Sequence, residues 1–281
     1  MMTRLDPDDL SERERTAVEH LLYRLADDEL VLAERYTEWQ VAAPTLESDL
    51  ALANIAQDEL GHARLWYDLL QDLGYSESDL IYERDPGEFR HATLAEVPFE
   101  DGDWADAVVR GYLYDVAENC RLEALEDSAH PRIVNRVGKV RGEEEYHREH
   151  ARNWLERLAG DEDGRRRLQS AVDRLFPHAL TLFEPTDETV EEDVVDLGIR
   201  RRGLDDLREE WLATVEPFLE SVGLRLPMDP DDDHADHLPD AVGRDRSHTD
   251  DWVDLHDEMT RTYRELERTD TTRIMDKPTD E

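Results

Sequence analysis

The sequence is short of cysteine, of lysine and of long apolar runs, and each shortage excludes a class of protein. One cysteine, Cys120, rules out an internal disulfide and leaves too few thiols for a cysteine-ligated zinc site. No apolar run approaches the roughly 20 residues that span a bilayer, and the N-terminus lacks the apolar centre of a secretory signal. We therefore expect a cytoplasmic protein without a membrane span, in which any metal binds through histidine and carboxylate side chains.

The shortage of lysine stands against a large excess of acid. The 281 residues include 72 Asp and Glu but only two lysines, Lys139 and Lys277, and the formal net charge is -39. A charge of this sign disfavours nucleic acid as a partner. Acid spread along the whole chain is typical of a surface adapted to concentrated salt, which screens the repulsion, so we infer a halophilic source. A local acidic functional patch would not explain why lysine is missing throughout.

The apolar pattern predicts four long helices arranged as two hairpins. We expect them over residues 11–41, 45–74, 103–129 and 131–160, where apolar side chains recur at spacings of three and four. Ser11 with Glu14 forms a capping box at the first start, and Pro131 suits the first position of the last helix. One long connection between two helical hairpins is the arrangement of a ferritin-like bundle. The expected fold class is therefore all-α, a ferritin-like four-helix bundle with additional C-terminal helices at about 165–183 and 204–222.

The chain is expected to divide into three parts. Residues 1–228 would form the helical bundle with its additional helices, and residues 229–247 would form an exposed acidic linker rich in aspartate. Residues 248–281 would form a C-terminal helix and tail. The amphipathic stretch 248–268 within this last part would pack back on the bundle or bind a partner, and a plain surface helix is the alternative.

The motif Glu-x-x-His occurs three times, and two copies lie in predicted helices. The three pairs are Glu59 with His62, Glu144 with His147, and Glu88 with His91. A spacing of three places both side chains on one helical face, so both can reach the same metal ion. The first two pairs fall on the apolar faces of the second and fourth predicted helices. The third pair falls in the connection between the hairpins, and we interpret it as a chance match.

Each of the other two long helices has one acid on its apolar face. Glu29 interrupts the apolar face of the first helix, and Asp115 interrupts that of the third. Glu29 lies 30 residues before Glu59 and Asp115 lies 29 residues before Glu144, so antiparallel hairpins bring each acid level with a Glu-x-x-His pair. Glu118, one turn after Asp115, is the alternative ligand if the third helix is rotated.

Six polar side chains directed into a helical core require a cation, because buried unpaired carboxylates cost several kcal/mol. The predicted ligand set is Glu29, Glu59, His62, Asp115, Glu144 and His147. Four carboxylates with two histidines suit two iron ions, with manganese as the second choice. The alternative is a bundle whose buried acids pair with arginine and bind no metal.

Four residues beside the predicted ligands have two interpretations each. Asp58 and Glu143 precede ligand glutamates, and they either orient a histidine through its outer nitrogen or lie on the surface. Gly61 and Gly111 lie inside predicted helices, where each costs about 1 kcal/mol relative to alanine. They either leave room for oxygen or substrate beside the metals or allow close helix packing.

Two groups of short motifs resemble a known family. The first group comprises Glu38-Trp39, Ala43-Pro44-Thr45-Leu46, residues 49–55 and residues 57–64; the second comprises Gly243-Arg244, His248-Thr249 and Glu258-Met259. The first group resembles the subunits of phenylacetyl-CoA epoxidase, also called phenylacetate-CoA oxygenase, and the C subunit most closely. The second group resembles the closing motif of that same C subunit. The similarity therefore covers nearly the whole chain.

The resemblance implies a multicomponent monooxygenase that epoxidises the ring of phenylacetyl-CoA during aerobic phenylacetate degradation. A catalytic di-iron A-type subunit would pair with a C-type subunit, and a separate flavin and iron–sulfur reductase would supply electrons. C subunits of the family are regarded as structural because they have lost metal ligands, whereas this chain keeps all six positions in the pattern of the catalytic A subunit. The chain is thus either a catalytic component or a scaffold for the catalytic subunit. A different ferritin-like di-metal oxidase, active in iron storage or peroxide dismutation, is the third hypothesis.

Overall fold

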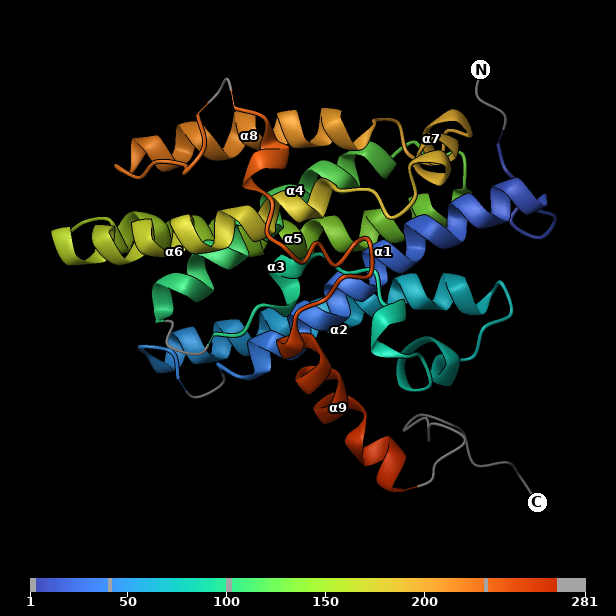
Figure 1. Cartoon of the computed structure of the whole chain (residues 1–281), viewed down its shortest axis with the longest axis horizontal. Coiled ribbons are helices and arrows are strands. Elements are labelled where there is room, and N and C mark those ends of the chain that lie inside the picture. Colours follow the sequence, from blue (N-terminus) through green and yellow to red (C-terminus); the bar gives the residue numbers. More distant parts are fainter. Residues whose placement is uncertain (1–3, 40–41, 100–102, 230–231, 267–281) are drawn as a thin grey trace.

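Four long helices form the body of the molecule in the computed structural model, which describes residues 4–39, 42–99, 103–229 and 232–266 (Figure 1). The long helices are α1 (Glu12–Thr37), α2 (Leu46–Gln71), α4 (Trp104–Leu125) and α5 (Pro131–Leu158). All regular elements within the described residues are helices, as the periodicity predicts. None of the helices in this described part is long and apolar enough to cross a membrane.

The long helices pair as two hairpins, α1 with α2 and α4 with α5, and α2 also contacts α5. The predicted start signals are confirmed: Ser11 and Glu14 form a capping box at α1, and Pro131 occupies the first turn of α5. The α1 helix ends at Thr37, and Val41, its predicted end, lies outside the described residues. The α4 helix ends before Ala129, because the backbone of Ala129 bonds to Leu5 and Gly198 instead.

Additional helices cover the α4 side of the bundle. They are α6 (Glu162–Leu180), η3 (Thr181–Phe183), α7 (Glu188–Asp196) and α8 (Leu204–Ser221). The α6 and α8 helices pack against α4, and α7, which the apolar pattern did not predict, packs against α1. As a result, only Asn119 and Glu123 of the α4 residues are not buried. The α4 helix is therefore the central helix of the fold.

The connection between the hairpins is a packed structure rather than an open loop. It contains the short elements η1 (Ser78–Tyr82), η2 (Pro86–Glu88) and α3 (Thr93–Glu96). Phe89, His91 and Leu94 within it are completely buried. The sequence offered no long periodicity here, because each element is only one turn long. These short elements form the surface on which the C-terminal part of the chain rests.

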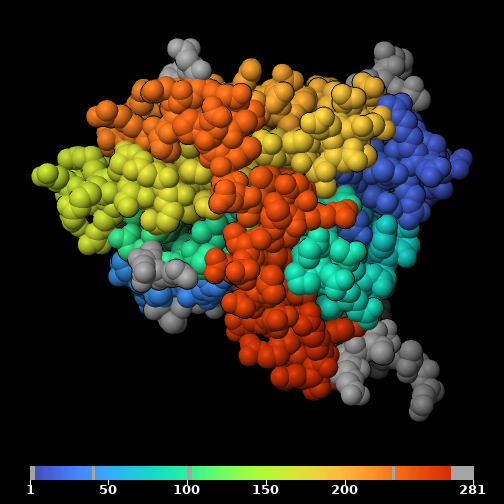
Figure 2. Space-filling view, in the orientation of Figure 1, coloured from blue at the N-terminus to red at the C-terminus, as the bar shows by residue number. Residues whose placement is uncertain are grey.

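The C-terminal part crosses the bundle before it ends in α9 (Asp250–Glu265), as Figure 2 shows. The α9 helix packs back against α3, η1 and η2, and the buried Trp252 indole donates to the Pro86 carbonyl at 2.9 Å. The stretch before α9 also contains η4 (His234–His237). The expected linker is not exposed throughout, because Arg244 is completely buried. The division into 1–228, 229–247 and 248–281 remains a prediction, and residues 267–281 of the expected tail lie outside the described residues.

Candidate metal centre

The predicted ligands meet where the four long helices face one another, and all of them are buried. They are Glu29 of α1, Glu59 and His62 of α2, Asp115 of α4, and Glu144 and His147 of α5. Their ligand atoms form two groups, Glu29 with Glu59, His62 and Glu144, and Glu59 with Asp115 and His147. Within each group the atoms lie within 4.8 Å of one another. The structure thus brings together all six side chains that the sequence singles out.

Two of the carboxylates lie between the two groups. Glu59 belongs to both. Glu144 Oε1 lies 3.2 Å from His62 Nδ1 and 3.5 Å from His147 Nδ1. The two imidazole rings are 6.2 Å apart between their centroids. The arrangement therefore contains two neighbouring candidate cation sites, and Glu59 and Glu144 each contact both histidines.

Many of the buried atoms at this centre have no hydrogen-bond partner among the residues that the structure describes. Both oxygens of Glu29, Glu59 and Glu144, one oxygen of Asp115, and Nδ1 of both histidines lack one. Such atoms are costly to bury, so native proteins almost always pair them. Two cations placed among them would supply the missing interactions. Oxygen and imidazole donors in this number suit iron or manganese, so the residues present fit a di-metal centre.

The electrostatics of the metal-free centre favour bound protons. Burial and the neighbouring Glu59 raise the pKa of Glu29 well above its usual value, and burial with Glu144 does the same for Asp115. Burial lowers the pKa of His62, but Glu144 and Glu59 outweigh burial and raise this pKa to about 11. The same opposing causes raise the pKa of His147 to about 12. Protons therefore occupy the centre when metal ions do not, and ions would displace them.

Each histidine of the centre is oriented by an acid from the opposite hairpin. His62 Nε2 on α2 donates to Glu143 on α5 at 2.7 Å, and His147 Nε2 on α5 donates to Asp58 on α2 at 3.3 Å. Because the outer nitrogen carries the donated proton, the lone pair of a neutral ring lies on Nδ1, which faces the carboxylates. Asp58 and Glu143 are both partly exposed, and each is hydrogen-bonded to a histidine. They therefore lie at the surface and also orient the histidine rings, as the two interpretations of these acids proposed separately.

Asp115, and not Glu118, joins the candidate ligands. Glu118 is also completely buried, but its carboxylate pairs with Arg121 one turn along α4. It belongs to neither group of candidate ligand atoms. The sequence allowed two rotations of α4, one directing Asp115 and the other Glu118 to the centre. The structure has the rotation that directs Asp115 there.

Two buried acids directly before Glu29 escaped the sequence analysis. Asp27 and Asp28 are completely buried, and each has cationic partners. Asp27 accepts hydrogen bonds from Tyr67, Arg84 and the Arg90 amide, and Asp28 accepts from Arg121, Arg244 and the Ala92 amide. These arginines lower the pKa of both aspartates, although burial acts in the opposite direction. Among the described residues, Asp27 and Asp28 pair with arginines, whereas the oxygens of Glu29 have no hydrogen-bond partner and the nearer one lies 3.9 Å from Nδ1 of His62.

The two helical glycines have different surroundings. Gly61 is exposed, and a Cβ atom there would meet no atom within 4 Å, so neither interpretation of this glycine applies. A Cβ atom on Gly111 would lie 3.3 Å from the Tyr36 hydroxyl and 3.9 Å from Asp115. Gly111 lines a cavity of about 20 Å³ beside Asp115 and His147, which can hold one very small molecule. The absence of a side chain at Gly111 keeps this space open.

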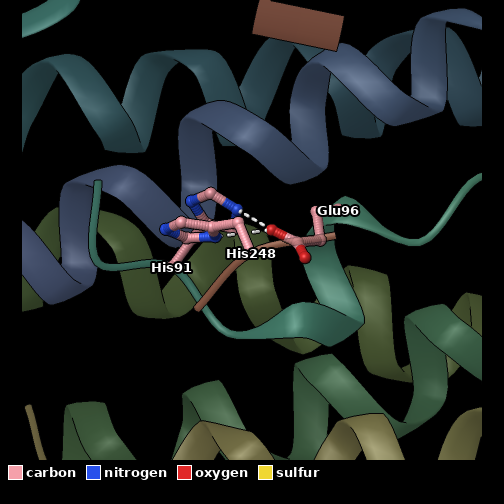
Figure 3. A group of neighbouring side chains, drawn as sticks. All are labelled: His91, Glu96 and His248. Carbon is pink, nitrogen blue, oxygen red and sulfur yellow. Dashed lines mark hydrogen bonds and ion pairs between the residues drawn. The ribbon is translucent and has the colours of Figure 1, made fainter. Parts of the chain in front are cut away.

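The third Glu-x-x-His match has no role as a pair. Glu88 accepts from the Asp85 amide and caps its own turn. His91 instead contacts Glu96, to which its Nε2 donates a hydrogen bond at 2.6 Å (Figure 3). Glu96 also contacts His248, so His91 belongs to a different cluster that the sequence spacing did not reveal.

Comparison with known proteins identifies the family. A family model described as phenylacetic acid catabolic protein matches residues 1–270. The chain is 33% identical over 213 residues to the C subunit of 1,2-phenylacetyl-CoA epoxidase from Escherichia coli (strain K12), covering 73% of this chain and 82% of that protein. It is 29% identical over 196 residues to the A subunit of the same epoxidase, covering 69% of this chain and 62% of that protein. The chain therefore belongs to the phenylacetic acid catabolic protein family.

Proposed function

We propose that the chain is an oxygenase component of a phenylacetyl-CoA ring 1,2-epoxidase in aerobic phenylacetate degradation. Its partners would be an A-type catalytic subunit, the other subunits of the complex, and a flavin and iron–sulfur reductase that supplies electrons. The observation that carries the proposal is the set of six buried ligand side chains with unpartnered atoms. The family membership adds the reaction and the acyl-CoA substrate.

The proposed roles follow from the two groups of ligand atoms. Glu29 with His62 would hold one iron ion, and Asp115 with His147 would hold the other, while Glu59 and Glu144, which contact both histidines, could serve either ion. Manganese is the second choice of metal by ligand type. When bound, the metal pair would supply the redox chemistry that activates dioxygen. The protein keeps the two imidazole rings oriented through Asp58 and Glu143 and keeps the centre buried.

The route of the organic substrate is proposed from two neighbouring spaces. A surface groove of about 540 Å³ is lined by residues of α2 and α5, including Tyr146, His150 and Trp154. His150 also lines the cavity of about 20 Å³ beside Asp115 and His147. The inner cavity holds a diatomic molecule but not a phenyl ring. Because His150 lines both spaces, movement of its side chain is the proposed way for an acyl group bound in the groove to approach the centre.

A non-catalytic scaffold is the alternative function. The higher identity to the C subunit, and the larger share of that protein that is covered, favour it. In that case the chain would bind the catalytic A-type partner and leave the chemistry to it. The six ligand positions favour the catalytic proposal, since a scaffold needs no buried carboxylates without partners. A different ferritin-like di-metal oxidase would share the centre but would not use the acyl-CoA.

Metal analysis and a double substitution separate these functions. The chain reconstituted anaerobically with ferrous iron in molar salt is expected to bind two ions, and a value near zero in folded protein would leave the scaffold. The substitutions His62→Ala and His147→Ala together should abolish binding while the circular dichroism stays unchanged. Assembled with its partner subunits, this variant should lose oxygen-dependent turnover of phenylacetyl-CoA beyond that of the partners. Unchanged turnover would identify a scaffold.

The acidic surface is proposed as an adaptation to a cytoplasm of high salt in a halophilic source. The net charge of -39 with two lysines supports this proposal. Concentrated salt shortens the range of repulsion between surface carboxylates to a few ångströms, so the folded state tolerates them.

A further inference from the structure

The C-terminal part of the chain reaches the vicinity of the candidate metal centre through one side chain, Arg244. Arg244 is completely buried, although it lies in the stretch between η4 and α9 that crosses the bundle (Figure 1). Its Nη2 donates to Asp28 Oδ2 at 2.6 Å, and its Nη1 donates to the backbone carbonyl of Arg90. Asp28 directly precedes Glu29 on α1. Arg244 therefore contacts the helix that supplies a candidate ligand.

Two local features fix the position of Arg244. Gly243 has a φ of +71°, and a Cβ atom there would lie 2.3 Å from the His91 carbonyl oxygen, so only glycine fits. Four residues after Arg244, His248 Nδ1 lies 2.7 Å from Glu96 Oε2, to which His91 Nε2 also donates at 2.6 Å (Figure 3). Both distances are shorter than the roughly 3.3 Å that separates two ligand atoms of one tetrahedral metal ion, so they indicate direct hydrogen bonds and not shared metal ligands. The cluster of His91, Glu96 and His248 therefore holds the segment before α9 in place through hydrogen bonds.

A chain of buried ion pairs leads from Arg244 toward the centre. Arg121 on α4 donates through Nη1 to Asp28 and pairs through Nη2 with Glu118. Glu118 is completely buried and lies one turn after the candidate ligand Asp115 on α4. In this chain two arginines balance two carboxylates, all of them buried.

We infer that Arg244 selects the ligand set of the metal centre by keeping Glu118 out of it. With Arg244 in place, Asp28 has its own cation, and Arg121 is able to hold Glu118. Without Arg244, Arg121 is the one arginine of the described residues that still donates a hydrogen bond to Asp28, and its single charge does not balance both Asp28 and Glu118. Glu118 then turns toward the ions and competes with Asp115. Arg244 is thus a positioning residue, and this inference rests on the metal centre of the proposed function.

Cobalt binding by the full chain tests the inference without any catalytic assay. Co²⁺ alone is added to metal-free protein in molar salt, and its visible absorption bands report the ligands around the ion. The substitution Arg244→Gln should shift these bands relative to the wild type, because Glu118 enters the ligand set. Adding Glu118→Gln to Arg244→Gln should restore the wild-type bands, which a merely structural effect of losing Arg244 would not do.

Two further variants test the charge balance itself. The pair Asp28→Asn with Arg244→Gln removes one acid and one cation together, so Arg121 stays with Glu118 and the bands should match the wild type. The substitution Arg121→Gln releases Glu118 directly and should shift the bands as Arg244→Gln does, even if the latter variant does not fold. The matched control is Arg84→Gln, which unpairs Asp27 on the same helix but has no link to Glu118. Its bands should stay unchanged.

The outcomes separate the inference from the proposed function. Wild-type bands in a folded Arg244→Gln variant, or in Arg121→Gln, overturn the inference and leave the metal centre intact. A band shift that Glu118→Gln does not reverse also overturns it, because the shift then has another cause. If the wild-type protein binds no cobalt, the metal centre itself is wrong, and the inference fails with it.

Discussion

Metal binding at the candidate centre should become much stronger as the pH rises. In the metal-free protein the pKa of His62 is raised to about 11 and that of His147 to about 12, so both rings are protonated at neutral pH. The pKa values of Glu29 and Asp115 are also raised well above their usual range. Two metal ions can bind only after Nδ1 of each histidine has lost its proton, so binding releases at least the two imidazolium protons.

The magnitude follows from this proton count. Each proton released makes the overall association constant rise about tenfold per pH unit, because one pKa unit corresponds to about 1.4 kcal/mol. For two protons and two pH units, from 6.5 to 8.5, the constant for binding both ions should rise about 10⁴-fold. The rise continues until the pH passes the raised histidine pKa values. Protons held by Glu29 or Asp115 would steepen it further.

Two measurements test this dependence. Competition with a chelator of known affinity gives the association constant for Mn²⁺ or Co²⁺ at each pH, and an indicator dye in weak buffer counts the protons released. The variant carrying His62→Ala and His147→Ala serves as the control, since it should bind neither ion and release no protons when metal is added. An association constant that stays the same between pH 6.5 and 8.5, with no proton release, would refute the reasoning.

Three further outcomes are expected. Lowering the salt from molar to dilute should unfold the protein because its charge of -39 is no longer screened, and unchanged circular dichroism would contradict this. The substitution Arg84→Gln should lower the free energy of unfolding by about 3–5 kcal/mol, since it leaves the buried Asp27 without its cation; a loss below about 1 kcal/mol in urea titration would disprove it. The substitution Gly243→Ala should lower the midpoint of thermal unfolding because of the contact with His91, whereas an unchanged midpoint would show that the segment adapts.

The positions of the candidate ligands could be predicted from the sequence because they share the periodicity of the core. Glu59 and His62 stand where apolar side chains would otherwise stand in α2, so the pattern that predicts the helix also predicts their burial. The nearly equal spacing within the two hairpins, 30 and 29 residues, then placed Glu29 and Asp115 at the level of the Glu-x-x-His pairs. Helical periodicity and the antiparallel hairpin are thus sufficient to predict the burial and the level of these side chains.

The partners of Asp27 and Asp28 could not be predicted in the same way. Three consecutive residues of a helix cannot all lie on one apolar face. The pattern of α1 alone therefore predicts that Asp27 and Asp28 lie on the surface. Asp27 is buried beneath Tyr67 of α2 and Arg84 of the connection between the hairpins, and Asp28 is buried beneath Arg121 of α4 and Arg244 of the segment before α9. Arg244 meets Asp28 across 216 residues of chain, and no short-range pattern predicts such a contact. The elements η1, η2 and α3 between the hairpins could not be predicted either, because each is only about one turn long and too short to show a helical period.

The crossed pairing of the histidines has a consequence for the order in which the molecule is assembled. Asp58 belongs to the hairpin that does not contain His147, and Glu143 belongs to the one that does not contain His62. A hairpin that has formed alone, as during synthesis on the ribosome, therefore presents a histidine whose ring is free to rotate. Both rings acquire their orientation only when the two halves dock. Metal capture would then mark the completion of tertiary assembly, and premature loading of a half-made chain would be disfavoured.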